Sequence, residues 1–143
     1  QILVPDSVLA LGKLAAVVLS QVRAETGLKV IGITGSNGKT STKNMLRQVL
    51  SRHGETIAPQ ESYNNEVGAP ISILKIDEST KYLVAELGAG GVGSIEYLAK
   101  MTKPDVGVVL KVGLVAGYQI MTSELSLRCQ GLSWQQFLLP FHL

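Results

Sequence analysis

The sequence predicts an α/β domain with a mostly parallel sheet and helices on the faces of that sheet. Three short β-branched runs, at residues 28–33, 82–87 and 106–110, alternate with stretches of helical periodicity. The connections between these runs are long enough for βαβ crossovers, which pair strands in parallel. A glycine-rich loop, GITGSNGKTS at residues 32–41, separates the first run from the next helical stretch. This is the position at which α/β domains bind phosphate.

The first predicted element is a helix over residues 8–25. Asp6 or Ser7 is a suitable N-cap, and Gly27 can end the helix in a left-handed conformation. Apolar residues at helical spacing predict one buried stripe on this helix, made of Leu9, Leu14, Val17, Val18 and Val22. The strand at 28–33 follows directly.

Helices and strands continue to alternate beyond the glycine-rich loop. Apolar residues from Thr40 onward predict a second helix, and a brief strand is expected at 56–58. Pro70 can open a short helix, because the first helical turn does not need the backbone N–H that proline lacks. The last predicted helix, over residues 95–101, follows Ser94, which is a suitable N-cap.

Composition and charge narrow the class of protein. The chain has 143 residues, of which 45% are apolar, enough for one domain with a buried core. Its 13 basic and 11 acidic residues are scattered, so we expect no nucleic-acid partner. No run of 18 uncharged apolar residues occurs, so we expect no membrane span. Cys129 is the only cysteine and cannot form an internal disulfide, which favours a cytoplasmic location.

The glycine-rich loop is the first candidate site. Glycines let the backbone approach a phosphate closely, and the positive end of the following helix attracts its charge. The expected ATP-binding residues are Gly35, Ser36, Asn37, Gly38, Lys39, Thr40 and Ser41. In this motif the lysine reaches the outer phosphates and the next hydroxyl binds Mg²⁺, which are the expected roles of Lys39 and Thr40.

The loop departs at one position from the usual pattern G-x-x-x-x-G-K-[ST]. The first glycine of that pattern would fall at position 33, which is Ile33. The alternative is therefore an ordinary turn that carries a solvated lysine. The strand before the loop and the helix after it favour the nucleotide site, because the motif requires that context.

Polar residues elsewhere in the chain are expected near the same edge of the sheet. Glu86 ends a predicted strand, where a carboxylate can hold Mg²⁺ beside a phosphate loop. The alternative for Glu86 is a strand-end glutamate that points to solvent. Asn64 and Asn65 lie in a polar loop that would reach this edge, although asparagine pairs are also common in turns.

Four stretches together carry a resemblance to a known family. They are TGSNGKTSTKNML, YNNEVGAP, YLVAELGAGGVGSI and KPDVGVVLKVG, in this order. Over roughly residues 2–115 the chain resembles the central ATP-binding domain of the Mur ligases. PDSVLALGKLA resembles the end of that family's first, UDP-sugar-binding domain. The resemblance implies three parts: the end of that first domain with a linker helix at 1–26, a partial central domain at 27–116, and an unassigned tail at 117–143.

The resemblance also implies an activity. It points to an ATP-dependent ligase of peptidoglycan precursor synthesis that joins D-alanyl-D-alanine to UDP-N-acetylmuramoyl-tripeptide. ATP would phosphorylate the tripeptide carboxylate, and the dipeptide amine would then attack the acyl phosphate. Lys39 would neutralise the phosphates, Thr40 and Glu86 would hold Mg²⁺, and Asn64 and Asn65 would lie near the reacting carboxylate. The chain alone is expected to be inactive, because the sites for the tripeptide and dipeptide are largely missing from it.

The resemblance breaks off near Val115. The family usually has N-V-G-x-A-H after its last strand here, whereas this chain has Lys111 in place of the asparagine and lacks the histidine. Residues 117–143 contain no lysine to match the family's metal-bridging one. We hypothesise that residues from about Val115 onward are translated out of frame.

Two alternative functions remain open from the sequence. One is a stand-alone nucleotide-binding module whose aromatic tail docks a partner. The other is a different ligase of the same superfamily.

Overall fold

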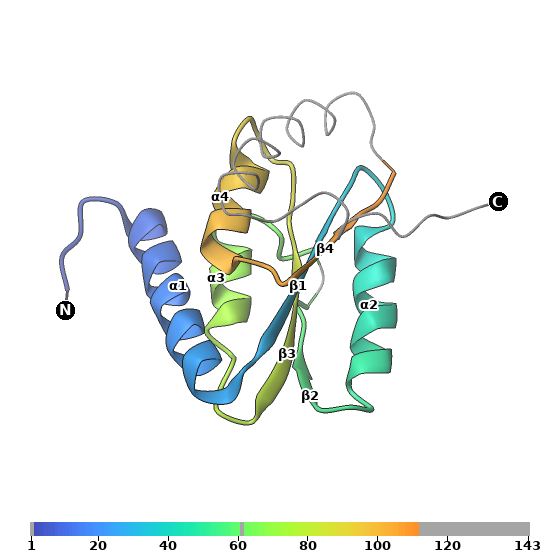
Figure 1. Cartoon of the computed structure of the whole chain (residues 1–143). Helices are drawn as coiled ribbons and strands as arrows, with labels where there is room; N and C mark the ends of the chain where they lie inside the picture. The colour runs from blue at the N-terminus through green and yellow to red at the C-terminus, as the bar shows by residue number, and fades with distance from the viewer. Residues whose placement is uncertain (1, 61, 112–143) are drawn as a thin grey trace.

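The computed structural model describes residues 2–60 and 62–111, which form one parallel sheet flanked by helices (Figure 1). The strands are β1 (Lys29–Thr34), β2 (Glu55–Ile57), β3 (Thr80–Glu86) and β4 (Val106–Val109). The helices are α1 (Ser7–Thr26), α2 (Lys39–Leu50), α3 (Gly68–Ile73) and α4 (Ser94–Thr102). The order across the sheet is β2-β3-β1-β4, with every neighbouring pair parallel. The predicted fold class is confirmed.

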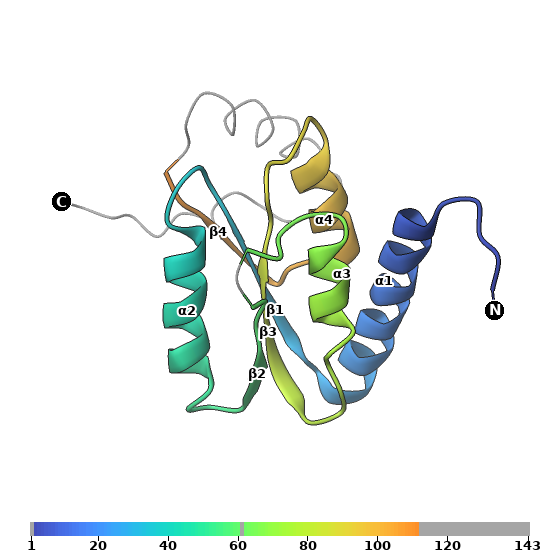
Figure 2. The same cartoon turned by 180° about the vertical axis from the view of Figure 1, so that it is seen from behind.

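The helices form a layer on each face of the sheet. Figures 1 and 2 show α2 on one face, with α1, α3 and α4 on the other. Side chains alternate between the faces along each strand. In β1, Val30 joins the core under α1, α3 and α4, whereas Ile31 and Ile33 join the core under α2. Because both faces are covered, β1 is an almost continuous apolar run rather than an alternating one.

The first helix has the predicted ends. The Asp6 carboxylate accepts a hydrogen bond from Leu9 N at 2.9 Å, and Gly27 ends the helix with φ of 70°. Both features provide hydrogen-bond partners for backbone groups that have none within the helix at its ends.

The predicted apolar stripe of α1 is wrong in part. The buried positions are Gly12, Ala15 and Leu19, while Leu9, Leu14 and Val17 are exposed. Apolar residues occur all round this helix, so their spacing does not specify one face. The small residues decide instead, since they let α1 approach the neighbouring helices closely, and the Tyr97 hydroxyl fills the space beside Gly12.

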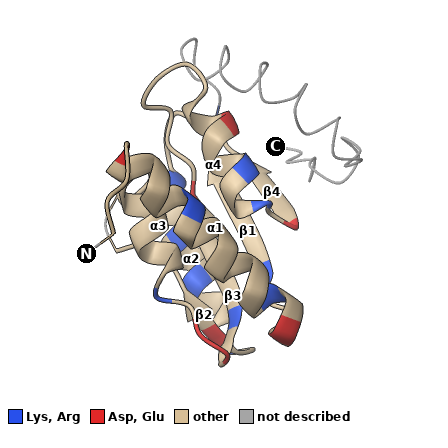
Figure 3. Cartoon of the chain, turned by 90° about the vertical axis from the view of Figure 1, so that its left-hand side faces the viewer, with Lys and Arg blue, Asp and Glu red and all other residues tan. Residues whose placement is uncertain are grey.

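By length and composition alone, α1 could also cross a membrane. This is weak support for a span, because core helices of water-soluble proteins meet the same criterion. In the structure Ala15 and Leu19 of α1 share a core with Leu28, Val30 and Leu83 of the sheet region. Figure 3 views the α1 side, where Lys and Arg lie on several elements, separated by uncharged segments.

Two predicted helix starts are shifted. The third helix, α3, begins at Gly68, two residues before Pro70, because Asn65 Oδ1 already accepts from the N–H groups of Val67 and Gly68. Ser94 is the first residue of α4 and not its cap, a position that Gly93 takes with φ of 89°. The division at residues 26 and 27 stays a prediction, and the tail at 117–143 lies outside the described residues.

Candidate nucleotide-binding site

The glycine-rich loop connects the carboxyl end of β1 to the first turn of α2. Gly35 has φ of 138° and Gly38 has φ of 85°, conformations that residues with a Cβ rarely adopt. Gly38 is the N-cap of α2 and places no side chain over the helix end. The first N–H groups of an α-helix lack partners within the helix, and together with the helix dipole they form a binding site for an anion.

The end of β4 supports this loop. Leu110 N donates to Thr34 O at 2.9 Å, and Ser36 N donates to Lys111 O at 2.8 Å. A Cβ at Gly35 would lie 2.8 Å from the Cβ of Leu110, so space as well as φ requires glycine there. The contact at Lys111 uses only its main chain, so it does not depend on the side chain that departs from the family pattern.

Lys39 lies across the loop. Its Nζ donates to the carbonyl oxygen of Gly35 at 2.6 Å, and the residue is partly buried. Ser36, Asn37, Gly38 and Ser41 are exposed around it. The predicted ATP-binding residues therefore lie on one accessible loop and helix start, although their contacts with a nucleotide stay a prediction.

Glu86 is the carboxylate at the centre of the site. It is the last residue of β3 and pairs in register with Ile33 of β1. Two positions after Val84, it faces the same side of the sheet, toward α2. Only 1% of the residue is exposed, so the alternative of a solvent-facing glutamate is wrong.

Three side chains surround the Glu86 carboxylate. Thr40 Oγ1 donates to Glu86 Oε2 at 3.3 Å, and Asn64 Nδ2 donates to Oε1 at 2.9 Å. Lys43 Nζ lies 3.8 Å from Oε2. Thr40 and Lys43 are three positions apart on α2 and so project on the same side of that helix. The predicted pair of Thr40 and Glu86 is thus brought together across 46 residues of sequence.

The two asparagines have different positions. Asn64 O accepts from Gly88 N at 2.8 Å, which ties the polar loop to the chain just after β3. Its side chain then reaches Glu86. Asn65 instead lies just before α3, and its Oδ1 accepts from Gly68 N, in the first residue of that helix, at 2.7 Å. Asn64 therefore contacts the Glu86 carboxylate, whereas the amide oxygen of Asn65 binds the backbone at the start of α3. The predicted positions of both asparagines near the reacting carboxylate of a substrate stay predictions.

Two further residues of the site were missed from the sequence. Lys43 follows Lys39 by four positions and Thr40 by three, and this helical spacing could have placed it beside Glu86. Glu66 accepts a hydrogen bond from Ser94 Oγ at 2.7 Å and so links the polar loop to α4, just after the second glycine-rich stretch. No local pattern indicates that pairing, because the two residues are 28 positions apart.

The oxygen atoms near Thr40 fit a magnesium ion that binds together with phosphate. A hydroxyl and a carboxylate are the hard oxygen ligands that Mg²⁺ prefers. Within residues 2–60 and 62–111, no group of three or more His, Cys, Asp or Glu side chains could hold a metal by itself. Mg²⁺ commonly binds through one or two carboxylates and completes its shell with water and substrate phosphates. The residues present fit that mode of binding.

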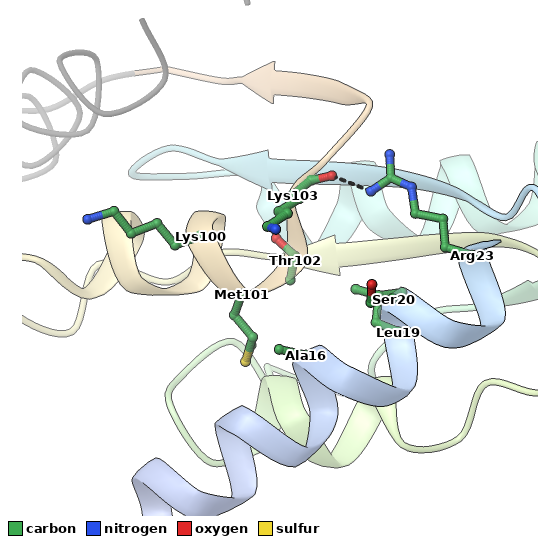
Figure 4. A pocket seen from close by; sticks show the side chains of 8 residues that line it. All are labelled: Ala16, Leu19, Ser20, Arg23, Lys100, Met101, Thr102 and Lys103. Carbon is green, nitrogen blue, oxygen red and sulfur yellow. Dashed lines mark hydrogen bonds between the residues drawn. The ribbon is translucent and has the colours of Figure 1, made fainter. Parts of the chain in front are cut away.

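A separate cavity of about 140 Å³ lies between α1 and α4 (Figure 4). Arg23 reaches across its edge, with Nη1 donating to Lys103 O at 2.7 Å and Nη2 lying 2.6 Å from Asp105 Oδ1. None of the predicted site residues lines this cavity. Its lining residues are Ala16, Leu19, Ser20, Arg23, Lys100, Met101, Thr102 and Lys103.

A parallel sheet, a glycine-rich loop leading into a helix, and a buried carboxylate on the adjacent strand define a phosphate-loop nucleotide-binding domain. The chain also matches the Mur ligase middle domain over residues 33–114. It therefore belongs to the Mur ligase family.

The similar proteins are named as one kind of ligase. Over 104 residues the chain is 50% identical to the UDP-N-acetylmuramoyl-tripeptide--D-alanyl-D-alanine ligase of Mycobacterium leprae. The aligned region covers 73% of this chain and 20% of the relative. Over 109 residues the chain is 39% identical to the Escherichia coli enzyme of the same name, and this aligned region covers 76% of this chain and 23% of the relative. The chain thus spans about a fifth to a quarter of the curated relatives it matches.

Solved structures agree with the fold. One crystal structure of MurF from Acinetobacter baumannii matches with a TM-score of 0.75 at 35% identity, covering 97% of this chain and 30% of that chain. The MurF ligase from Thermotoga maritima, solved in complex with ADP, matches with a TM-score of 0.72 at 33% identity. That match covers 85% of this chain and 29% of the other.

Proposed function

We propose that this chain binds Mg-ATP and forms the nucleotide-binding part of a ligase that joins D-alanyl-D-alanine to UDP-N-acetylmuramoyl-tripeptide. One observation carries the nucleotide site: the Thr40 hydroxyl, directly after the phosphate loop, lies 3.3 Å from the buried Glu86 carboxylate. The names of the relatives support the ligase, and the ADP complex of the similar Thermotoga maritima protein supports the nucleotide. A cytoplasmic location agrees with the single cysteine, Cys129.

Different residues of the site would bind different parts of Mg-ATP. Backbone N–H groups of residues 35–38 and the first turn of α2 would donate to the phosphates. Lys39 would exchange its bond to Gly35 O for the outer phosphates. Thr40 and Glu86 would hold Mg²⁺, which when bound neutralises charge on the β- and γ-phosphates.

The proposed reaction proceeds through an acyl phosphate. A carboxylate oxygen of the tripeptide would attack the γ-phosphorus of ATP, and ADP would leave. The amine of D-alanyl-D-alanine would then attack the acyl carbon, and inorganic phosphate would leave as the amide forms. The contribution of the chain to these steps is positioning and stabilisation of negative charge. Asn64 and Asn65 are proposed to lie near the reacting carboxylate.

The nucleotide site is tested by calorimetric titration of the purified chain with ATP in the presence of Mg²⁺. Lys39→Met should weaken ATP binding by about 10-fold or more, because a charge-assisted hydrogen bond contributes about 1.5–3 kcal/mol. Lys13→Met is the matched control, since Lys13 is exposed on α1 and its removal changes the net charge equally. A folded chain without affinity for ATP, or equal losses in the two variants, would contradict the proposal.

A further inference from the structure

We propose that Glu66 is a positioning residue for the nucleotide site and acts through Ser94 rather than through contact with a ligand. Glu66 fixes the polar loop before α3 against the start of α4, and this loop in turn holds Asn64 at the Glu86 carboxylate. The inference deepens the proposed function and rests on it, because the site that Glu66 shapes is the one proposed to bind Mg-ATP.

The segment after β3, residues 88–93, lies at the same edge of the sheet as the phosphate loop. β1 and β3 are adjacent and parallel, so their carboxyl ends meet at this edge. The helices that follow them lie on opposite faces of the sheet, α2 on one and α4 on the other (Figures 1 and 2). Ligands of open α/β sheets bind outside the carboxyl ends of the strands where the connections diverge in this way. Residues 88–93 therefore border the proposed site.

The polar loop holds this segment at both of its ends. At the first end, Gly88 N donates to Asn64 O at 2.8 Å. Just beyond the other end, Ser94 Oγ donates to Glu66 Oε1 at 2.7 Å. Between these contacts, residues 90–92 are exposed and include two glycines. Because glycine loses more conformational freedom on ordering than any other residue, such a segment depends on its end contacts to stay in one conformation.

The start of α4 favours a carboxylate at the position of Glu66. Gly93 is the N-cap of α4 and provides no side chain for the first N–H groups of the helix. Ser94 is the first residue of the helix, so Glu66 Oε1 lies beside its positive end. The contact is partly buried. Glu66 thus contributes both a hydrogen bond and a favourable charge, and an amide in its place would keep only the hydrogen bond.

Glu66 affects the site because Asn64 lies two residues before it in the same loop. Asn64 binds Gly88 through its carbonyl oxygen and Glu86 through its amide nitrogen, at 2.8 Å and 2.9 Å. Loss of the bond between Glu66 and Ser94 removes the anchor at α4 and lets Asn64 move away from the Glu86 carboxylate. A purely structural Glu66 would lower the free energy of unfolding and leave the ATP affinity of the folded chain unchanged.

The test is calorimetric titration of the full chain with ATP in the presence of Mg²⁺, at a temperature where each variant is folded. We expect Glu66→Ala and Ser94→Ala each to weaken binding by about 10-fold, because each removes the same charge-assisted hydrogen bond. The double variant should bind about as weakly as either single variant, since the two changes remove one shared contact. Ser94→Thr keeps the hydroxyl and should restore the affinity. Glu66→Gln keeps the acceptor and should restore it in part.

The matched control is Glu96→Ala. Glu96 is also a carboxylate in the first turn of α4, but its partner is Lys100 of the same helix, at 2.6 Å. Its removal changes the net charge equally and leaves the polar loop in place. An equal loss of ATP affinity in Glu96→Ala and Glu66→Ala would assign the effect to charge at the helix end and overturn the inference.

Hydrogen exchange followed by NMR separates local opening of the loop from general loss of stability. In Glu66→Ala the Gly88 N–H should exchange at least about 10-fold faster than in the wild type, because its bond to Asn64 O opens with the loop. The Asp105 N–H donates to Val30 O at 2.8 Å, in the pairing of β4 with β1, and its exchange rate should change much less. Equal acceleration at both sites would show a general loss of stability and overturn the inference.

Failure of the inference and failure of the proposed function give different results. If the wild type binds ATP and the folded alanine variants bind it equally well, the inference about Glu66 fails while the nucleotide site stands. If Glu66→Ala does not fold, Ser94→Ala and Glu66→Gln decide by the same measurements. If the wild type has no affinity for ATP, the proposed function fails and the inference falls with it.

Discussion

Individual residues of the site are constrained by the atoms beside them. Gly88 illustrates this, because its backbone is not left-handed and a Cβ would still lie 2.6 Å from Asn64 O and 2.7 Å from Asn64 Oδ1. At Gly90, in the same glycine-rich stretch, the one atom of the described residues within 4 Å of an added Cβ is Ser94 Oγ, at 3.7 Å. The two glycines look alike in the sequence, but only one of them touches the residue that holds Glu86.

Gly88→Ala should therefore displace Asn64 and disturb the hydrogen bond from Asn64 to Glu86. We expect the free energy of unfolding to fall by about 1–3 kcal/mol, as for other overpacked positions, together with weaker nucleotide binding. Gly90→Ala is the control and should change both quantities little. Urea denaturation and calorimetric titration measure them, and equal effects of the two substitutions would show that the close contact does not matter.

Asp77 predicts a dependence of stability on pH. The Asp77 carboxylate accepts from Ser79 Oγ at 2.6 Å, Ser79 N at 2.9 Å and Thr80 Oγ1 at 3.2 Å. These hydrogen bonds, first of all the one from the Ser79 side chain, lower the pKa of Asp77 from its usual 3.8. The pKa of Asp77 is thus lower in the folded state than in the unfolded state. The stabilisation that Asp77 gives to the folded state is fully present above the unfolded-state pKa, and it is lost as the pH falls through the folded-state pKa.

Asp77→Asn should accordingly lower the Tm at neutral pH, and the difference from the wild type should shrink as the pH falls to about 2. Circular dichroism melts at several pH values measure this difference. Glu78→Gln serves as the control, because Glu78 is the next residue, is also exposed, and loses the same charge on substitution. A Tm difference for Asp77→Asn that stays constant with pH would contradict the assignment.

Among the elements, α1 shows how packing selects one face of a helix that is apolar all round. Its small face, with Gly12 and Ala15, lies against the neighbouring helices, and Leu19 completes the contact at 3% exposure. Leu14 is 54% exposed on the opposite side. The helix therefore belongs to the same core as the sheet, whatever its place in the predicted division at residues 26 and 27.

Leu19→Ala should lower the free energy of unfolding by about 2–5 kcal/mol, because it leaves a cavity in that core. Leu14→Ala, the same change on the exposed face, should cost less than about 1 kcal/mol. Urea denaturation with a common slope measures both. If Leu19→Ala costs no more than Leu14→Ala, α1 does not fold as part of the domain.

At the scale of the whole molecule, the chain corresponds to one part of a larger enzyme architecture. It covers 20% and 23% of the two relatives compared above, and its family match is the middle domain alone. The residues proposed to bind Mg-ATP, namely the loop, Thr40 and Glu86, all lie within the described residues. Forming an amide also needs sites that hold the tripeptide and the dipeptide in line with the phosphate.

We therefore expect the 143-residue chain to bind Mg-ATP and to form no amide from UDP-N-acetylmuramoyl-tripeptide and D-alanyl-D-alanine. Mass spectrometry of the reaction mixture detects the product, with the Escherichia coli ligase as the positive control. Any product formed by the purified chain would contradict this expectation.

The hypothesis of a reading-frame shift after about Val115 concerns residues outside the described part of the chain. Sequencing the source DNA across the codons for Lys111 to Leu143, in all three frames, tests it. A second frame that continues with an alanine-histidine pair and a downstream lysine would support the ligase. If only the present frame is coherent, the stand-alone nucleotide-binding module becomes the better explanation.

The sequence alone determined the elements and the phosphate loop, because these depend on neighbours within a few positions. Asp6 and Gly27 mark the ends of α1, the β-branched run marks β1, and Gly35 and Gly38 mark the loop. The spacing of GKT at the start of α2 also indicates which lysine can reach a phosphate. Local periodicity and turn chemistry are sufficient for such predictions.

Only the tertiary structure decided what surrounds Glu86 and which face of α1 is buried. Glu86 meets Thr40, Lys43 and Asn64 because the sheet order places β3 beside β1 and under α2. Those contacts join residues between 22 and 46 positions apart, beyond the reach of any local pattern. The physical reason is that burial and pairing are properties of neighbouring elements in space, whereas periodicity reports only which residues of one element share a face.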